Sequence, residues 1–328
     1  MLAFMRHLAL STLLALPLPL LAEPVLDLPI DCTLGDDCFL LNHVDSDPGA
    51  GAEDFTCGPL SYDGHKGTDF ALTSFAAMRD GVTVLAAAPG VVRGLRDGMP
   101  DLGLDGTPAE ELAGRDCGNG VLIDHGDGWE TQYCHLREGS VAVREGEEVA
   151  AGAPLGLVGF SGRTEFPHVH LAVRKDGAVI DPFDGDGVRL CGSDDGPGDD
   201  LWADPLAYVP GGIVSAGIFE GVPDYGDVKD GTAHRDSLPG AAPALVGWAL
   251  VHGARGGDRV EIVLTAPDGS VYPRSAATLE KAQALAMRAA GRKRPPGGWA
   301  TGRWRVETTL IRDGAVLDRA AASSALSD

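Results

Sequence analysis

Short apolar runs recur along the chain between glycine and proline residues, and this pattern restricts the chain to folds built from short strands. The runs read VTVLAAAPGVVRGL, GVLIDH, ETQYCHL, APLGLVGF and HVHLAVRKDGAVI. Valine, isoleucine and leucine stand at strand spacing in them, and Asp-Gly pairs between them are turn signals. The sequence therefore predicts a mostly β protein.

Two of the runs form a predicted hairpin. GNGVLIDH and WETQYCHL resemble strands joined at the GDG turn of residues 126–128. Folding the chain about that turn brings Cys117 almost opposite Cys134, which predicts a disulfide. Cys32 and Cys38 could close a small local loop, and Cys57 and Cys191 would then remain. Six cysteines allow many connectivities, so only the first pair rests on a structural argument.

The first 22 residues, MLAFMRHLALSTLLALPLPLLA, contain one charged residue, Arg6, ahead of an apolar run from Leu8 to Ala22. A run of about 15 residues is shorter than the roughly 20 that span a bilayer. We therefore predict that residues 1–22 are a secretory signal peptide and that the mature chain begins near Glu23. A retained membrane anchor is the alternative. No later segment is apolar enough to cross a bilayer, and an even number of cysteines suits an exported chain.

The charge is unevenly distributed. Residues 23–210 hold 11 basic and 35 acidic residues, whereas residues 211–328 hold 14 basic and 13 acidic residues. This shift, at the PGGIVSAG stretch of residues 210–217, predicts a boundary between two domains. An acidic first domain would be repelled by nucleic acid and by anionic lipid headgroups, so neither is an expected partner. The sequence does not indicate an oligomeric state.

The second domain, residues 211–328, is predicted as a small β-sandwich with one helix. LVGWALV, RVEIVLT and RWRVETTLI alternate as strands, and APDGSV and IRDGAV indicate hairpins. The expected helix is TLEKAQALAMRAA at 278–290, followed by the basic residues Arg292, Lys293 and Arg294. A basic cluster could bind an anionic polymer. Cations are favoured near a helix C-terminus in any case, so a solvated helix end is the preferred interpretation.

Five polar residues in three short segments of the first domain are candidates for chemistry. The segments are SYDGHKGTDF at 61–70, the YCHL stretch, and EFPHVHL at 165–171, in a chain with only nine histidines. The side chains at i and i+2 of a strand share a face, so His168 and His170 are expected to point into one site. The candidates are His65, Asp69, His135, His168 and His170.

The local sequence predicts how the other candidates are presented. Glycines around His65 disfavour a helix, so this histidine is expected on a loop, with Asp69 at the start of a strand. By strand alternation Tyr133 and His135 share one face and Cys134 points to the other. This interpretation puts the disulfide on one side of the strand and the chemistry on the opposite side.

Two histidines and one carboxylate suit zinc, and a catalytic zinc site keeps three protein ligands and an open position. Taken singly, each histidine is more often a hydrogen-bonded structural residue, and only the combination favours a site. Among the other histidines, His125 is expected to cap or pack the hairpin turn. The remaining four lack partners at a suitable spacing or leave with the signal peptide: His43, His234, His252 and His7.

These segments resemble a known family. GHKGTDF matches the H-x-G-x-D segment, QYCHL the Y-x-H-L segment and PHVHL the H-x-H segment of the lysostaphin/LytM-type zinc metallopeptidases, which are murein endopeptidases. The similarity covers roughly residues 60–183. It implies the antiparallel sheet of the duplicated hybrid motif for the first domain, residues 23–210. The family's ligand roles fall on His65, Asp69 and His170, and its catalytic roles on His135 and His168.

The resemblance implies an exported zinc metalloendopeptidase that hydrolyses the peptide cross-links of bacterial peptidoglycan, in the periplasm or outside the cell. Histidine would have to act as the base, because the chain has no H-E-x-x-H motif. Residues 97–116 interrupt the strand pattern as a long polar insertion, and we expect this segment to form one wall of a substrate groove.

Two other functions remain open. A non-catalytic LytM-like module would bind the wall or activate another hydrolase, but such modules lack zinc ligands that this sequence retains. A calcium-binding adhesin is suggested by Asp181, Asp184, Asp186 and the acidic residues at 194–200. These acidic residues lack the spacing of a calcium loop with its closing glutamate, so a solvated acidic loop is the preferred interpretation.

Overall fold

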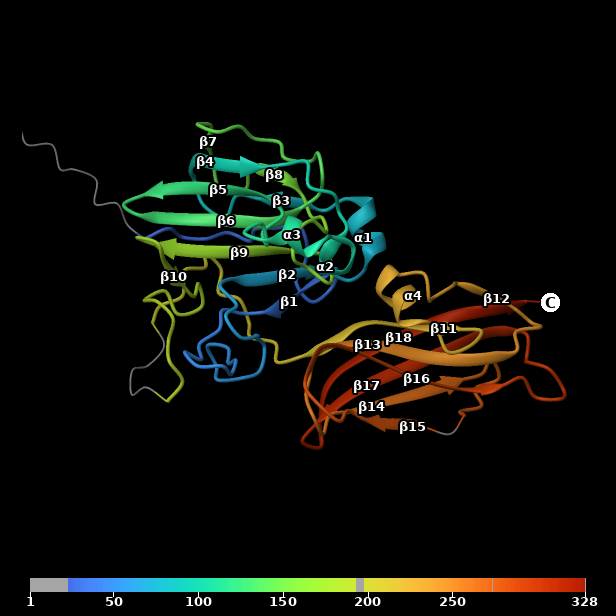
Figure 1. Cartoon of the computed structure of the whole chain (residues 1–328). Coiled ribbons are helices and arrows are strands. Elements are labelled where there is room, and N and C mark those ends of the chain that lie inside the picture. The colour runs from blue at the N-terminus through green and yellow to red at the C-terminus, as the bar shows by residue number, and fades with distance from the viewer. Residues whose placement is uncertain (1–22, 193–197, 273, 328) are drawn as a thin grey trace, which may run out of the picture.

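The computed structural model describes residues 23–192, 198–272 and 274–327. The predicted signal peptide and residues 193–197 of the acidic segment lie outside these ranges. The described chain forms two β-rich parts that lie side by side (Figure 1), which confirms the predicted mostly β fold. Within the described ranges, no helix combines the length and apolarity needed to cross a membrane.

The first part is built on an eight-stranded antiparallel sheet in the order β1-β2-β9-β6-β5-β4-β7, with β10 beside β9. Its strands are β1 (Cys38–Asn42), β2 (Thr68–Leu72), β4 (Gly90–Arg96), β5 (Asn119–Gly126), β6 (Trp129–Leu136), β7 (Glu148–Val149), β9 (His168–Lys175) and β10 (Ala178–Ile180). A separate two-stranded sheet pairs β3 (Thr83–Leu85) with β8 (Pro154–Leu157). Three short helices are α1 (Phe75–Asp80), α2 (Gly103–Gly106) and α3 (Ala109–Leu112). The insertion at 97–116 contains α2 and α3.

One face of the large sheet carries the hydrophobic core of this part. Tyr133, Leu136 and Leu171 are fully buried there, together with Val84 of β3 and Leu155 of β8. The small β3-β8 sheet therefore covers this face. The opposite face of β2, β6 and β9 remains available for polar side chains, and the candidate site lies on that face.

The predicted hairpin is confirmed. β5 and β6 pair through Gly126 and Trp129, and the two turn residues between them, Asp127 and Gly128, have φ values of 50° and 79°. Positive φ at both central residues is the requirement of a type I′ turn, which Asp-Gly satisfies.

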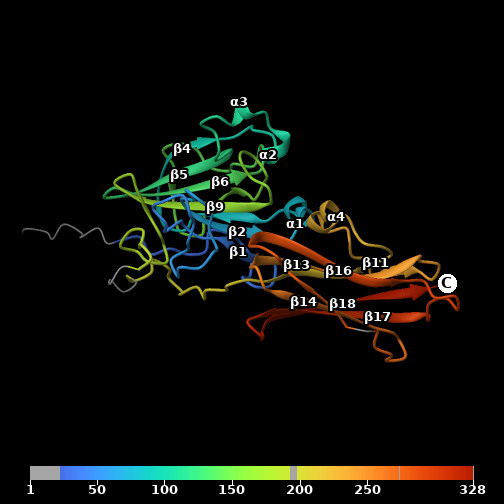
Figure 2. The ribbon, with the colours of Figure 1, turned by 60° about the horizontal axis from the view of Figure 1, so that its bottom comes forward.

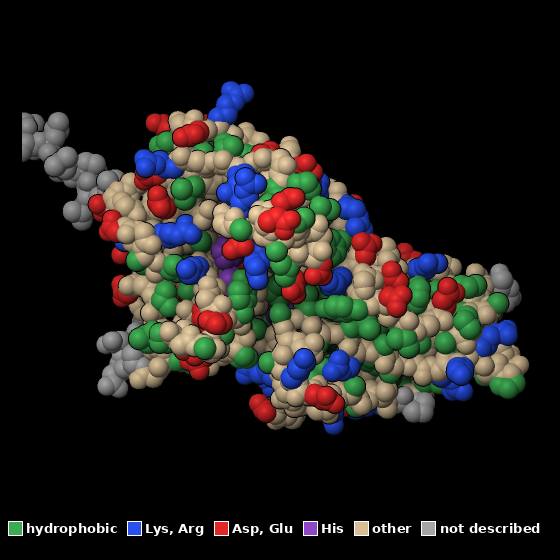
Figure 3. Space-filling view, in the orientation of Figure 1, with side chains coloured by type: hydrophobic (Ala, Val, Ile, Leu, Met, Phe, Trp, Pro, Cys, Tyr) green, Lys and Arg blue, Asp and Glu red, His purple; other side chains and the backbone are tan. Residues whose placement is uncertain are grey.

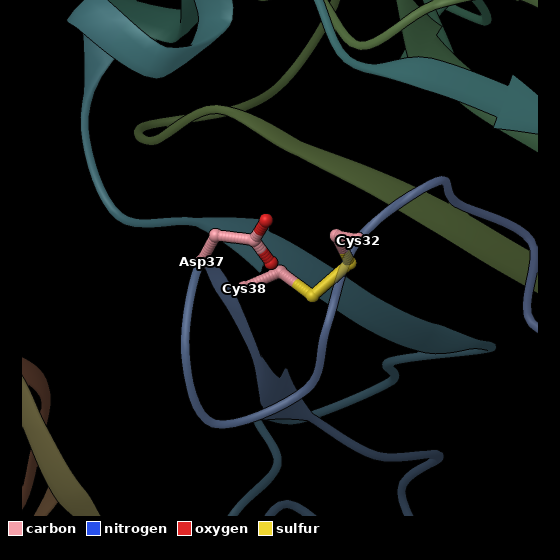
Figure 4. A group of neighbouring side chains, drawn as sticks. All are labelled: Cys32, Asp37 and Cys38. Carbon is pink, nitrogen blue, oxygen red and sulfur yellow. A yellow bond between two sulfur atoms is a disulfide. The ribbon is translucent and has the colours of Figure 1, made fainter.

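The three disulfides pair as the sequence suggested. Cys117 and Cys134 are joined with a Cα–Cα distance of 4.7 Å, within the usual range for a disulfide. Cys32–Cys38 closes a short loop just before β1 (Figure 4), and Cys57–Cys191 ties residues that are 134 positions apart. The second and third bridges both restrain irregular segments that flank the sheet.

The second part is a sandwich of two sheets. A three-stranded sheet has the order β11-β13-β16, and a five-stranded sheet the order β12-β18-β17-β14-β15. The strands are β11 (Gly212–Phe219), β12 (Ser237–Pro239), β13 (Ala244–Ala254), β14 (Arg259–Thr265), β15 (Ser275–Thr278), β16 (Gln283–Lys293), β17 (Gly302–Arg312) and β18 (Ala315–Ser327). Their inner faces share a separate core around Trp304, Val306 and Leu245. The boundary near residue 211 remains a proposal that rests on the charge distribution.

The helix predicted at 278–290 is wrong. This stretch contains the end of β15 and most of β16, and β16 pairs with β13 from Gln283 to Lys293. Alanine, leucine and glutamine favour helix locally, but a long register against β13 outweighs that preference. The helix found among the described residues of the second part is instead α4 (Tyr225–Asp230). Arg292, Lys293 and Arg294 accordingly lie at a strand end, not at a helix end.

The two parts contact each other through β1 and α1 of the first. Phe39 and Leu41 point away from the main core and pack with Val214 and Leu285 of the sandwich. Both Nη atoms of Arg79 on α1 bond the carboxylate of Asp230 on α4, at 2.7 and 2.9 Å. Figures 1 and 2 both show α4 beside α1, so the sandwich is placed next to one end of the large sheet.

Candidate functional site

Three of the predicted site residues converge on one point. Asp69 Oδ1 lies 2.8 Å from His170 Nδ1 and 3.2 Å from His65 Nε2, and the two imidazole nitrogens are 3.1 Å apart. We call these residues the ligand trio. Their donor atoms all lie within 4.8 Å of one another, close enough to bind a single ion.

The strand register explains this convergence. Asp69 on β2 stands directly opposite His170 on β9, and residues paired in this way present their side chains on the same face. His65 reaches them from the loop before β2. Gly67 makes room in that loop, because a Cβ there would lie 2.5 Å from the carbonyl oxygen of Leu171 and 2.6 Å from His170 Nε2. The glycine of the H-x-G-x-D segment is therefore a steric requirement of the site.

Neighbouring groups hold the trio in a form that suits a metal. His65 Nδ1 donates to the carbonyl oxygen of His43 at 2.6 Å, which leaves the Nε2 lone pair facing the trio. Asn42 Nδ2 donates to Asp69 Oδ2 at 2.9 Å, which leaves Oδ1 for the ion. Two imidazole nitrogens and one carboxylate oxygen form the donor set of a catalytic zinc site. The residues present thus fit the metal that the sequence implied.

The two remaining candidates flank the trio. His168 Nε2 lies 3.3 Å from Asp69 Oδ1, and the ring centroids of His135 and His168 are 4.7 Å apart. His168 Nδ1 donates to the carbonyl oxygen of Phe166 and His135 Nδ1 to that of Ser161, each at 2.8 Å. These bonds place a proton on Nδ1 of both rings, so each Nε2 is an acceptor in the site when the ring is neutral.

The expected alternation along β6 is wrong at this site. Tyr133 points into the core, where its hydroxyl accepts the backbone N–H of Ala87, while Cys134 and His135 both line the site. Pairing shifts from Val121↔Tyr133 to Asn119↔Leu136, so β6 carries one extra residue in a β-bulge.

His135 absorbs this bulge with φ of 64°, a conformation that costs about 1–3 kcal/mol in a residue other than glycine. The strain turns His135 onto the same face as Cys134. The Cys117–Cys134 disulfide therefore lies on the site's side of the sheet, not on the opposite side. It also supports the bulge, because the carbonyl oxygen of Cys117 accepts the His135 N–H at 2.8 Å.

The pKa values of the site residues favour an ionised Asp69, which suits binding of a cation. Burial alone would raise the pKa of Asp69, but the imidazoles of His65 and His168 hold it well below its usual value. Burial lowers the pKa of His135 well below its usual value, and lowers that of His170. Burial opposes protonation of His65 and His168 as well, yet attraction to Asp69 raises the pKa of both. A divalent cation would counteract that rise, because it repels the imidazolium form.

The trio lies in a recess of about 1100 Å³. Histidine side chains are visible inside it in the space-filling view (Figure 3). Leu104 and Asp116 of the 97–116 insertion contribute to its lining, in line with the wall expected there. Tyr62 contacts His65 at the rim with the two rings tilted and their centroids 4.4 Å apart, and Tyr62 is 54% exposed.

Within the described ranges, the other polar groups do not form a competing metal site. Two further clusters contain cysteines, Cys32 and Cys38 near Asp37 (Figure 4), and Cys57 and Cys191 near Glu53, but their sulfurs are joined in disulfides. Among the described residues, no potential metal cluster includes Asp181, Asp184 or Asp186, and part of the acidic segment lies outside them.

Two histidines outside the five candidates, His125 and His43, have structural contacts. His125 bonds the carbonyl oxygen of Pro89 and the hydroxyl of Thr131, each at 2.8 Å. It thus packs beside the hairpin as expected. His43 is buried among the rings of Phe55 and Phe183, and contributes its backbone oxygen to the site.

Sequence reasoning missed Asn42 and the carbonyl groups of Ser161 and Phe166. Asn42 reaches Asp69 because β1 pairs with β2 through a shifted register that sets Asn42 opposite Asp69. A polar residue at the end of an otherwise apolar strand, CFLLN, was the only signal in the sequence. Carbonyl partners leave no signal, because every residue has one.

A buried cluster of two histidines and an aspartate, on one face of an antiparallel sheet, is the donor set found in metal-dependent hydrolases. Residues 63–182 match the profile of Peptidase family M23. This part of the chain is therefore an M23 domain of the LytM type, as the sequence motifs indicated.

Named relatives share this domain. The chain is 43% identical over 65 residues to the DD-carboxypeptidase/endopeptidase Mpg of Neisseria meningitidis, covering 20% of this chain and 14% of that protein. It is 33% identical over 116 residues to the peptidoglycan DD-endopeptidase ShyA of Vibrio cholerae, covering 35% of this chain and 21% of that protein. The chain thus spans only a small part of the length of each relative.

Among solved structures, the catalytic domain of the prophage-encoded M23 protein EnpA from Enterococcus faecalis is 24% identical. The alignment covers 46% of this chain and 92% of that one, with a TM-score of 0.32. A TM-score this low supports no inference about function.

Proposed function

We propose that the protein is an exported zinc metalloendopeptidase that hydrolyses the peptide cross-links of bacterial peptidoglycan. The observation that carries this proposal is the ligand trio, His65, Asp69 and His170, with His135 and His168 beside it on one sheet face. The M23 domain and relatives named as peptidoglycan endopeptidases support it.

In this proposal the ligand trio holds the zinc. When bound, zinc supplies Lewis-acid chemistry: it polarises the scissile carbonyl and lowers the pKa of the attacking water towards about 7. Asn42 keeps Asp69 oriented, and the carbonyl oxygen of His43 fixes the tautomer of His65.

His135 and His168 then carry the proton chemistry. Both rings keep the Nδ1 proton on a backbone carbonyl, so Nε2 of each faces the site as a base. One ring accepts the proton of the attacking water, and the same or the other ring delivers a proton to the leaving amine. The imidazolium formed in this way also stabilises negative charge on the carbonyl oxygen of the substrate.

Export is proposed from the predicted signal peptide and agrees with the three disulfides, which persist in oxidising compartments. The first part is strongly acidic, so attraction to an anionic wall does not explain binding. Substrate binding is instead expected to rest on the shape of the recess and on hydrogen bonds to the peptide.

The test is digestion of purified murein sacculi with mass analysis of the released peptides, alongside measurement of bound zinc. We expect about one zinc per chain in the wild type. His170→Ala should lose zinc and activity together, because it removes a ligand. His135→Ala and His168→Ala should keep zinc and lose about 10²–10⁴ in rate. His234→Ala, at a histidine outside the recess, is the matched control.

Zinc binding without release of peptides by the wild type would instead identify a non-catalytic wall-binding or hydrolase-activating module. Wild-type rates in both His135→Ala and His168→Ala would refute the proposed proton chemistry. Loss of zinc from His168→Ala with retention in His170→Ala would reverse the roles of the two histidines.

A further inference from the structure

The sandwich of the second part forms one side of the recess that holds the ligand trio. Tyr225 and Lys229 of α4 line it, as do residue 282 and the first three residues of β16, 283–285. We call these residues the sandwich wall. The wall belongs to no part of the M23 match, which ends at residue 182.

The position of the wall is fixed by contacts between the two parts. Asp230, next to Lys229, receives both bonds from Arg79 on α1. An exposed ion pair contributes little by itself. However, Leu285 of the wall also packs against the buried cluster that contains Phe39 and Phe166. Phe166 directly precedes the PHVHL segment, so the wall is tied to the same loop that positions His168.

The wall presents a lysine that forms no ion pair within the described residues. Lys229 is half-buried with Nζ 5.1 Å from the ring centroid of Tyr225. Among the ion pairs of the described residues, none involves Lys229. An ammonium group without an ion-pair partner, beside an aromatic ring and inside a recess, is suited to bind a carboxylate of a ligand.

The wall also offers a free strand edge. β16 is the last strand of its sheet, and only β13 pairs with it among the described strands. Its first residues, Gln283 to Leu285, are the ones that line the recess. An unpaired edge supplies backbone N–H and C=O groups that an extended peptide can bind. The cation and the edge therefore suit the same kind of ligand, an extended peptide with a free carboxylate.

We propose that the sandwich wall determines substrate specificity by binding a free carboxylate of the peptide stem through Lys229. This inference rests on the proposed function, because the peptide stems of peptidoglycan are short peptides that carry free carboxylates. The second part of the chain thus contributes to substrate selection rather than serving only as a separate module.

The test uses the zinc-loaded mature protein and two synthetic cross-linked peptide stems. The two substrates have the same sequence and differ only in whether the carboxylates are free or amidated. We expect wild-type kcat/KM to favour the free carboxylates by roughly 10- to 100-fold, the range of a hydrogen bond to a charged group. Lys229→Met should reduce this ratio to about one through KM, with unchanged zinc content, and Lys229→Arg should retain most of it. Lys293→Met, at the opposite end of β16, is the matched control and should keep the wild-type ratio.

A wild-type ratio that persists in folded Lys229→Met would overturn the inference and leave the proposed function intact. So would an equal loss of the ratio in Lys293→Met, because that would indicate a general charge effect. If the wild type binds zinc but cleaves neither substrate nor sacculi, the proposed function itself fails and this inference fails with it.

Discussion

Asn42 provides a sharp test of the metal site, because it touches the ligand trio without belonging to it. Its Nδ2 donates to Asp69 Oδ2 at 2.9 Å, and both residues are buried. Asn42→Leu keeps the approximate volume and removes this hydrogen bond. A hydrogen bond to a charged group contributes about 1.5–3 kcal/mol, and loss of a partner of a metal ligand lowers metal affinity about 10–100-fold. At about 1.4 kcal/mol per tenfold, the two ranges agree.

The assay is zinc competition against a fluorescent chelator at neutral pH, with circular dichroism as the folding check. Gln132→Leu is the matched control, since this amide also lines the recess but accepts its hydrogen bond from Arg174 at 2.9 Å. We expect the control to keep wild-type zinc affinity. Unchanged zinc affinity in folded Asn42→Leu would show that Asp69 does not depend on Asn42, or is not a ligand.

Three further predictions follow from the packing around the site and between the two parts. Replacing Cys117 and Cys134 by serine should lower the free energy of unfolding by about 3 kcal/mol, from the loop entropy of a bridge with sequence separation 17. It should also lower kcat more than zinc content, because the disulfide supports the β-bulge that positions His135. Equal losses of murein hydrolysis and of bound zinc would contradict this role of the disulfide. Gly67→Ala should reduce zinc affinity, because the added Cβ would displace the His170 ring. In the control Gly64→Ala, the added Cβ has open space but the backbone φ is positive, so this change should lower stability and leave zinc affinity unchanged. Equal zinc affinity in Gly67→Ala and the wild type would refute the steric argument. Burial lowers the pKa of His252 to about 4, so its contribution to stability is complete above the unfolded-state value of 6.5 and is lost as the pH falls towards 4. Urea unfolding should show about 2 kcal/mol less loss between pH 7.5 and 5 in His252→Leu than in the wild type; parallel curves would contradict it.

The sequence predicted the site largely because its chemistry is concentrated in short segments. His168 and His170 lie two apart on a strand, so period-two alternation was sufficient to place them on one face. Asp69 was expected only at the start of another strand, and its role in the site came from the resemblance to the LytM-type motifs. The disulfide between Cys117 and Cys134 followed from a turn whose Asp-Gly pair has one favoured geometry. In these cases the local rules, strand alternation and Asp-Gly turn geometry, also hold in the folded structure.

The failures have a different origin. His135 reaches the site through a β-bulge and a positive φ. A bulge of one residue cannot be recognised from the alternation of apolar and polar residues in the sequence. Residues 278–290 have the composition of a helix, but their pairing with β13 depends on residues some forty positions earlier in the chain. The sandwich wall was missed for a related reason, since no local pattern shows which surfaces of two folded parts will meet.

The central position of β9 has a consequence for biosynthesis. β9 lies between β2 and β6 and carries both His168 and His170, so the last ligand is added by the strand that completes the middle of the sheet. A chain that has not yet reached residue 170 lacks part of the trio however well its earlier strands have formed. A nascent or truncated product therefore cannot acquire a complete metal centre. Under the proposed function, hydrolysis therefore begins only after β9 has joined β2 and β6 in the sheet.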